Sequence, residues 1–195
     1  KTFPVDEIYG MHNSPNGKPG TFDICKGVAM AGAMFFDAHI RGLGSHAAMP
    51  HQSRDTVVIA STLVSQLQTI VSRNVAPLDS CVMSVTQIHA GAAYNVVPEN
   101  AHIAGTVRYF REEVCNLAMQ RMQAICDGIA AAYEVEINLD MRNVFDVLVN
   151  DHELSDAYID AATDILGAEN VSDISVPATG SEDFADLLRG VPGAY

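Results

Sequence analysis

Residues 42–57, GLGSHAAMPHQSRDTV, place His46 directly after a serine in a glycine-rich segment. A histidine there could ligate a metal, act as the base for a Ser45 nucleophile or contact a substrate. It could also be a polar residue in a turn before a helix. The sequence does not favour a Ser45 nucleophile, because a nucleophile elbow needs Gly-x-Ser-x-Gly and Ala47 occupies the second glycine position. The second histidine, His51, is expected on the surface near the start of the helix.

Three further residues are of types that could bind or position a ligand. His12, in YGMHNSPNGKPG, ends a short expected strand, where it could be structural or could ligate a metal. In YNVVPENAHIAGTVR, Asn95 precedes a proline turn. Arg108 lies on the polar face of a strand, where it could bind a carboxylate or simply be solvated. A His-Glu-x-x-His zinc motif is absent from the sequence.

Composition limits the classes of partner. The formal net charge of −13 repels nucleic acid and anionic lipid, and no Lys/Arg cluster opposes it. The longest nearly uncharged stretch, GVAMAGAMFF, is about half of the roughly 20 residues needed to span a bilayer. Four cysteines without Cys-x-x-Cys spacing favour neither a zinc knuckle nor a disulfide framework. We therefore expect no nucleic-acid or membrane partner and a cytoplasmic location.

The middle of the chain, residues 31–143, has the periodicity of a complete small domain. Residues 33–41, 81–89, 101–109 and 135–141 alternate apolar and polar side chains, which predicts four half-buried strands. Residues 54–73 and 111–133 carry apolar residues at helical spacing. The order β-α-β-β-α-β predicts a ferredoxin-like α/β (α+β) sandwich, with two helices covering one face of an antiparallel sheet.

Both flanks lie outside this unit. Residues 1–30 contain a short strand and a Pro/Gly turn, and residues 144–195 contain an amphipathic helix over 152–167, a strand-like VSDISVPA and the turn TGSEDF. We interpret them as two pieces of a second domain into which the sandwich is inserted at a loop. The chain lacks an initiator Met and is expected to be an excerpt of a longer protein.

Four motifs in this order, GMHNSPNGKPG, GLGSHAAMPHQSRDTV, YNVVPENAHIAGTVR and GSEDFA, surround or lie within the β-α-β-β-α-β insert. Together they resemble the hippurate hydrolase-like N-acyl-amino-acid amidohydrolases, a branch of the aminoacylase and carboxypeptidase-type family of two-metal peptidases. The resemblance covers the whole chain. It implies an incomplete α/β catalytic domain at 1–30 and 144–195, and a lid or dimerisation domain at 31–143.

The resemblance also implies roles for individual residues. His12 matches a metal ligand of the catalytic domain. His46 matches the lid histidine that reaches the partner subunit's active site and steadies the developing oxyanion, with glycines beneath it that let the backbone turn sharply. Asn95 and Arg108 match substrate-contacting positions, Asn95 more closely. GSEDFA matches a turn into a late helix beside the active site, and Glu182 is given no catalytic role.

The implied reaction is metal-dependent hydrolysis of the amide bond of an N-acyl amino acid, in a homodimer formed through the lid. Two divalent ions, Zn, Mn, Co or Ni, are implied for the intact enzyme. The other metal ligands and the general-base glutamate are expected before residue 1 and after residue 195, so the 195-residue chain should be inactive and hold no metal firmly. The alternative is a stand-alone ferredoxin-like module that binds a small molecule or only dimerises.

Overall fold

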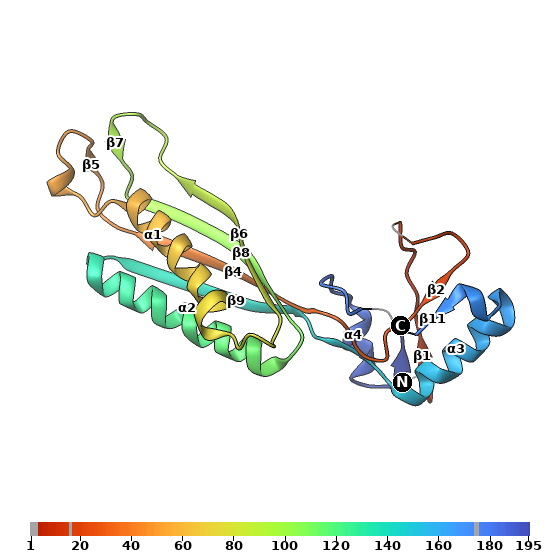
Figure 1. Cartoon of the computed structure of the whole chain (residues 1–195). Helices are drawn as coiled ribbons and strands as arrows, with labels where there is room; N and C mark the ends of the chain where they lie inside the picture. The colour runs from red at the N-terminus through yellow and green to blue at the C-terminus, as the bar shows by residue number, and fades with distance from the viewer. Residues whose placement is uncertain (1–3, 16, 174–175) are drawn as a thin grey trace. The chain divides into compact units, whose positions relative to one another are not determined.

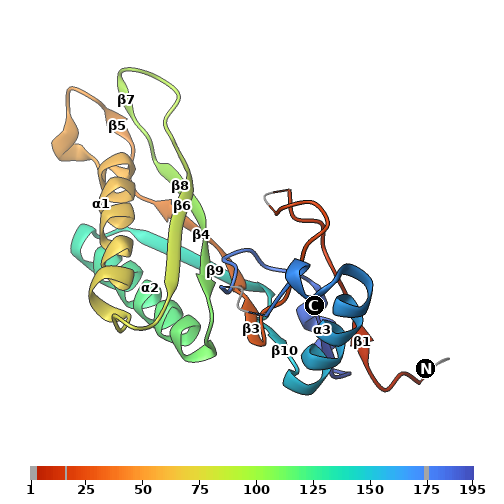
Figure 2. The ribbon, with the colours of Figure 1, turned by 45° about the vertical axis from the view of Figure 1, so that its right-hand side comes forward.

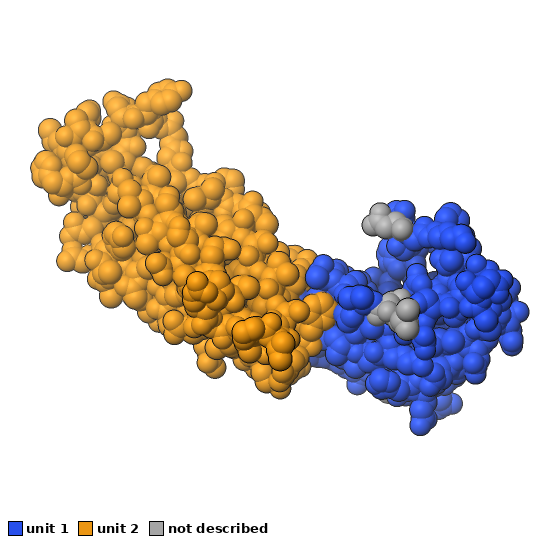
Figure 3. Space-filling view, viewed as in Figure 1, with its two compact units in different colours: residues 1–32, 145–195 blue, residues 33–144 orange. Residues whose placement is uncertain are grey.

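A computed structural model of the chain describes residues 4–15, 17–173 and 176–195. It divides the chain into two compact units (Figure 3). We call residues 33–144 the sandwich unit, and residues 1–32 with 145–195 the flanking unit. No helix in the described ranges is long and apolar enough to cross a membrane.

The sandwich unit is built on a four-stranded sheet with two helices on one face (Figures 1 and 2). The strand order is β6-β8-β4-β9, the order of a ferredoxin-like fold, so the predicted fold class is confirmed. Its long elements are β4 (Gly32–Arg41), α1 (Thr56–Thr69), β6 (Cys81–Ala90), β8 (Asn100–Tyr109), α2 (Glu112–Tyr133) and β9 (Glu136–Phe145).

Side-chain alternation along β4 explains which face of the sheet the helices cover. Met34, Phe36, Ala38 and Ile40 are at most 1% exposed and form the core. The intervening residues lie on the opposite face of the strand. Burying the apolar face under two amphipathic helices stabilises the unit and leaves the other face polar.

Helix α1 is capped by an aspartate. The Asp55 carboxylate accepts hydrogen bonds from the backbone N–H groups of Val57 and Val58, so Asp55 is the N-cap. The sequence predicts a single helix over 54–73. In the structure α1 ends at Thr69, and residues Ile70–Asn74 form a π-helical turn, η2. Helix α2 carries Glu112 and Glu113 in its first turn, where the helix dipole favours negative charge.

The flanking unit consists of short pairings between segments far apart in the sequence. The first strand pairs in parallel with the last, and an antiparallel pair joins β3 to β10. Its elements are β1 (Ile8–Tyr9), β2 (Phe22–Asp23), β3 (Gly27–Met30), β10 (Leu148–Asn150), α3 (His152–Leu166), η3 (Ala168–Asn170), β11 (Val171–Ser172), α4 (Phe184–Leu188) and β12 (Gly193–Ala194).

The predicted helix at 152–167 is present as α3. Of the strand-like segment 171–178, Val171 and Ser172 form β11, which pairs with β2, and residues 174–175 lie outside the described residues. The assignment of the two units to a lid and a catalytic domain, with bounds 1–30, 31–143 and 144–195, stays a prediction.

Candidate active site

His46 lies on a two-stranded ribbon at one end of the sandwich unit (Figure 1). Strand β5 (Ser45–His46) pairs antiparallel with β7 (Val96–Val97), and His46 is directly opposite Val96. The side chain of His46 is exposed. A short 3-10 helix, η1 (Pro50–Gln52), which contains the exposed His51, follows on the way to α1.

The hydrogen bonding of His46 fixes which ring nitrogen carries the proton. The backbone N–H of Ala48 donates to Nδ1 of His46 at 3.1 Å. Nδ1 is therefore an acceptor, and in the neutral ring the proton lies on Nε2. Nε2 can then donate a hydrogen bond to an oxygen outside the ribbon, which is the property that an oxyanion donor needs.

Asn95 lies beside His46. The backbone N–H of Ala47 donates to the carbonyl of Asn95 at 3.0 Å, across the same ribbon. The side chain of Asn95 is exposed. The structure thus brings together two of the predicted site residues, which are 49 positions apart in the sequence.

The glycines before His46 serve a purpose other than the predicted one. Neither Gly42 nor Gly44 has a positive φ, so a sharp turn is not the reason for them. Instead a Cβ on Gly42 would lie 2.3 Å from the carbonyl oxygen of Arg54, and one on Gly44 would lie 3.0 Å from that of Val97. The expectation of a sharp glycine turn was wrong, and the glycines allow close approach of neighbouring backbone.

Ser45 is not arranged as a nucleophile. Its hydroxyl donates to the backbone carbonyl oxygens of His46 and Met49, at 3.2 and 3.3 Å. Nδ1 of His46 accepts from the backbone and Nε2 of the neutral ring carries the proton, so neither nitrogen is available to accept a proton from Ser45. The geometry therefore argues against Ser45 as a nucleophile.

Arg108 lies far from this ribbon. It stands on β8 opposite Val82, eight residues beyond Asn100, which is about 27 Å along a strand that rises about 3.4 Å per residue. Residues 33 and 144, where the chain enters and leaves the sandwich unit, belong to the start of β4 and the end of β9. Near the start of β4, the Thr106 hydroxyl donates to the Met34 carbonyl at 3.2 Å, which places Arg108 toward that end of the sheet.

His12 lines a cleft of about 840 Å³ in the flanking unit, together with Asp23, Lys18 and Tyr195. Nδ1 of His12 lies 3.0 Å from the carbonyl oxygen of Asn13. A carbonyl only accepts, so Nδ1 carries the proton and the lone pair of the neutral ring lies on Nε2. Metal-binding histidines commonly use one nitrogen while the other donates to a carbonyl in this way.

Sequence reasoning missed Tyr195 as a member of this cleft. Its hydroxyl donates to Oε2 of Glu182 at 2.9 Å, and the buried Asn150 side chain bonds both its N–H and its carbonyl. A Cβ on Gly10 would lie 2.9 Å from the Tyr195 ring, so the His12 segment packs closely against it. The pKa of Tyr195 is raised by burial and then by the bond to Glu182. A terminal Gly-Ala-Tyr carries no signal of these contacts.

No three His, Cys, Asp or Glu side chains in the described ranges are placed to hold a metal ion together. Within the flanking unit, His12 has the donor chemistry of a ligand, as its tautomer shows. Its role as a ligand stays a prediction, as do the roles of His46, Asn95 and Arg108.

With the geometry in place, comparison with known proteins assigns the family. Residues 28–134, more than half of the chain, match the family described as "Peptidase dimerisation domain". The chain belongs to the M20 peptidase family. The resemblance drawn from the four sequence motifs is thereby confirmed.

Two curated relatives match nearly all of this M20 chain. It is 39% identical over 191 residues to N-acetyl-L-cysteine deacetylase from Bacillus subtilis (strain 168). This alignment covers 98% of the chain and 45% of that protein. It is 35% identical over 193 residues to hippurate hydrolase from Campylobacter jejuni. This alignment covers 99% of the chain and 50% of that protein. The chain thus spans about half the length of these relatives.

Among solved structures, the M20 chain is similar to a Bacillus subtilis protein described as a dinuclear metal-binding peptidase of the M20 family. The TM-score is 0.75 at 28% identity, over 97% of this chain and 47% of that one. Both units of the chain are therefore found together in a known M20 structure.

Proposed function

We propose that this chain supplies the lid and part of the catalytic domain of an amidohydrolase that cleaves the amide bond of N-acyl amino acids, including hippurate-like ones. The observation that carries the proposal is the tautomer of His46, whose Nδ1 accepts from Ala48 and whose Nε2–H is left to donate from an exposed ribbon. The relatives named as deacetylase and hippurate hydrolase act on amides of this class.

In the proposed mechanism His46 donates from Nε2 to the carbonyl oxygen of the substrate as negative charge develops on it. A donor that is already oriented costs no reorganisation at that moment, and removing such a donor typically slows catalysis by about 10²–10³. The Asn95 amide, beside His46 on the same ribbon, holds the substrate in register with this donor. Arg108 pairs with the carboxylate of the amino-acid portion.

The flanking unit would contribute His12 as one ligand of a pair of divalent ions, through Nε2. When bound, such ions polarise the carbonyl and lower the pKa of water. Zn, Mn, Co and Ni all accept imidazole nitrogen, so His12 does not select among them. One imidazole does not hold two metals, and we infer that the 195-residue chain alone binds metal weakly and is inactive.

The outer surface of α1 supports self-association of the lid as a homodimer. No residue from Thr56 to Ser72 is charged, and Val57 and Val58 are 44% and 51% exposed. The hydroxyls of Ser61 and Ser65 donate to carbonyls of their own helix, at 2.8 and 3.1 Å. Covering this face therefore removes few unpaired polar groups from water.

Strand β6 offers a second surface for self-association. It is an edge strand of the sheet, and Val82 and Ile88 on it are 42% and 54% exposed. An exposed edge can pair with the edge of a second copy. A two-fold dimer that used α1 and β6 would present the same patch from each subunit.

The separation of the candidate residues supports a shared active site. His46 and Asn95 lie on the ribbon, and Arg108 lies toward the far end of β8, about 27 Å by strand length from Asn100, where that strand begins next to the ribbon. One small substrate does not span that distance. We infer that Arg108 serves the site of its own chain and that His46 and Asn95 serve the site of the partner.

The proposal is tested with a full-length protein that carries this chain, assayed against N-acetyl and N-benzoyl amino acids with each of the four metals. Release of free amino acid that depends on added metal and falls after His46→Ala supports it. Absence of hydrolysis across the panel, in a folded and metal-loaded protein, would favour the stand-alone binding or dimerisation module instead.

A further inference from the structure

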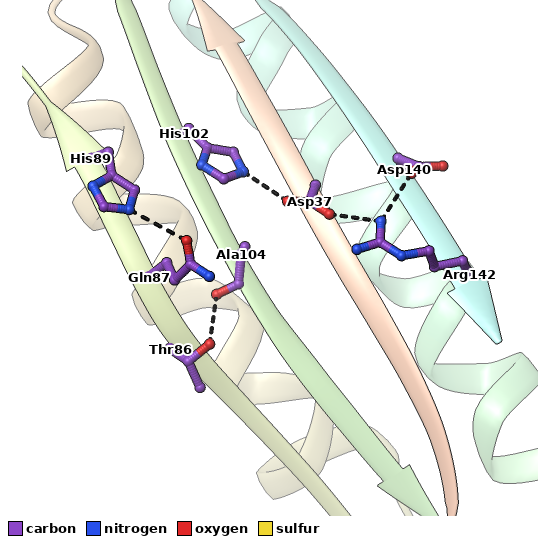
Figure 4. A network of polar contacts seen from close by, with 8 residues as sticks. All are labelled: Asp37, Thr86, Gln87, His89, His102, Ala104, Asp140 and Arg142. Atoms are coloured by element: carbon purple, nitrogen blue, oxygen red, sulfur yellow. Dashed lines mark hydrogen bonds and ion pairs between the residues drawn. The ribbon is translucent and has the colours of Figure 1, made fainter. Parts of the chain in front are cut away.

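The polar face of the sandwich sheet carries a row of three imidazole rings that the proposed function does not use. His39, His102 and His89 come from the adjacent strands β4, β8 and β6. The His39 and His102 rings are stacked with centroids 4.6 Å apart, and the His89 and His102 rings with centroids 6.0 Å apart. Figure 4 shows His89 and His102 on the sheet face turned away from the helices.

Asp37 fixes the central ring of this histidine row. Its Oδ1 accepts from Nε2 of His102 at 2.8 Å, and its Oδ2 accepts from Nη1 of Arg142 at 2.8 Å (Figure 4). These bonds, first that to His102 and then that to Arg142, lower the pKa of Asp37. The Asp37 carboxylate is thus ionised and already paired with a cation, and it is only 23% exposed.

A cavity of about 440 Å³ lies against the histidine row. Its donors are the three imidazoles, the Arg41 guanidinium and the amides of Asn100 and Asn138. One carboxylate, that of Glu136, also lines it. The volume falls within the range of about 300–1,000 Å³ usual for small-molecule sites.

The charged groups around the row come from β4, β9 and the residue before β8. Arg41 pairs loosely with Glu99 at 3.5 Å, and both are more than half exposed. Arg142 also contacts Asp140 at 3.3 Å. Among the residues that the structure describes, these charged groups are Asp37, Arg41, Glu99, Glu136, Asp140 and Arg142.

The stacked geometry of the histidine row favours an anion as its ligand. Two cationic rings with centroids 4.6 Å apart would repel each other. An anion placed against the ring edges offsets that repulsion. Because the rings are close to parallel, their nitrogens do not converge on one point as metal ligands must.

We propose that this cavity binds a small carboxylate anion together with a proton taken up by the histidine row. Arg41 offers the paired N–H groups that fit a planar carboxylate. Glu136 adds a negative charge to the lining, which disfavours a phosphate dianion more than a singly charged carboxylate. This site is separate from the His46 ribbon and does not depend on the proposed hydrolase activity.

The test is a titration of the 195-residue chain with sodium acetate at constant ionic strength, followed by the imidazole NMR signals. It is run at about pH 6 and about pH 8, on either side of the range in which imidazole usually changes charge. Saturable shifts of the His39 and His89 signals are expected at the lower pH. Linkage to one proton weakens the affinity by up to about tenfold per pH unit at the higher pH.

Variants and a second anion locate the site and its chemistry. The double variant His39→Gln/His89→Gln should lose saturable acetate binding, whereas His51→Gln, which alters an exposed histidine on η1, should keep it. Both variants leave the Asp37–His102 contact in place. Equal affinity at the two pH values, persistence in the double variant, shifts without saturation, or tighter binding of inorganic phosphate than of acetate would each overturn the proposal.

Discussion

The hydroxyl of Tyr195 donates to the Glu182 carboxylate at 2.9 Å, and this bond joins the residue that follows β12 to the segment that leads into α4. The same tyrosine lines the cleft that contains His12 and packs against Gly10. Tyr195 therefore links the C-terminal part of the flanking unit to the Gly10–His12 segment, which lies more than 180 residues earlier in the sequence.

Tyr195→Phe is expected to lower the free energy of unfolding by about 1–2 kcal/mol, because the Glu182 carboxylate loses its hydroxyl donor. The matched control is Tyr158→Phe, whose hydroxyl makes a longer bond of 3.3 Å to the Gly10 carbonyl and should cost less. Urea denaturation of the two variants measures the difference. An equal cost for both would contradict the importance of the Glu182 bond.

The raised pKa of Tyr195 also predicts how stability changes in alkali. Folding favours the protonated phenol, so its contribution is present below the ordinary tyrosine pKa of about 10 and is lost as pH rises above it. The wild-type chain should therefore lose more stability above about pH 10 than Tyr195→Phe does. Parallel alkaline curves for the two chains would contradict this.

Asp37→Asn tests the anchor of the histidine row. The lowered pKa of Asp37 means that folding favours its ionised form, so its contribution is present above the ordinary pKa of about 4 and is lost as pH falls through the folded value. The variant should be about 1 kcal/mol less stable at neutral pH and less sensitive to acid. Asp140→Asn, which alters a more exposed partner of Arg142, should be nearly neutral. If Asp140→Asn lowered the stability as much as Asp37→Asn does, the role of Asp37 as the anchor of the histidine row would be contradicted.

Gly105→Ala tests the packing of the sandwich unit. A Cβ at this position of β8 would lie 2.1 Å from the Ser84 carbonyl oxygen and 2.6 Å from the Phe36 ring, so the strand must shift. We expect a loss of about 1–3 kcal/mol, the usual cost of overpacking, or a failure to fold. The control, Gly128→Ala on α2, meets nothing within 4 Å and should stabilise the helix by about 0.5–1 kcal/mol. In thermal unfolding, the midpoint temperature should fall for Gly105→Ala and rise for Gly128→Ala.

The sandwich fold could be predicted from the sequence because its signals are local. Strand β4 alternates from Met34 to Arg41, and α1 and α2 carry long apolar stripes. The flanking unit was harder, because β3 and β10 are short strands whose partners lie more than 100 residues away. Asn150 looks like a loop residue in the sequence, yet it is 1% exposed and fully bonded.

The candidate site was predictable only in part. The motif around His46 identified the residue, but its tautomer depends on a hydrogen bond from Ala48 that the sequence does not reveal. The contact of Asp37 with His102 depends on how β4 lies beside β8, which periodicity does not determine.

The proposal that His46 serves the active site of the partner subunit is tested most directly by subunit complementation in a full-length protein that carries this chain. Alone, His46→Ala should lower kcat by about 10²–10³ with its metal content unchanged, because it removes an oxyanion donor. His12→Ala should be inactive through loss of a metal ligand. After subunits of the two inactive variants exchange, about a quarter of all sites combine an intact His12 with an intact His46 from the partner. Activity should return to about a quarter of the wild-type value. If exchange is verified and the mixture stays as inactive as its parents, His46 does not serve the partner's site and the shared active site is wrong.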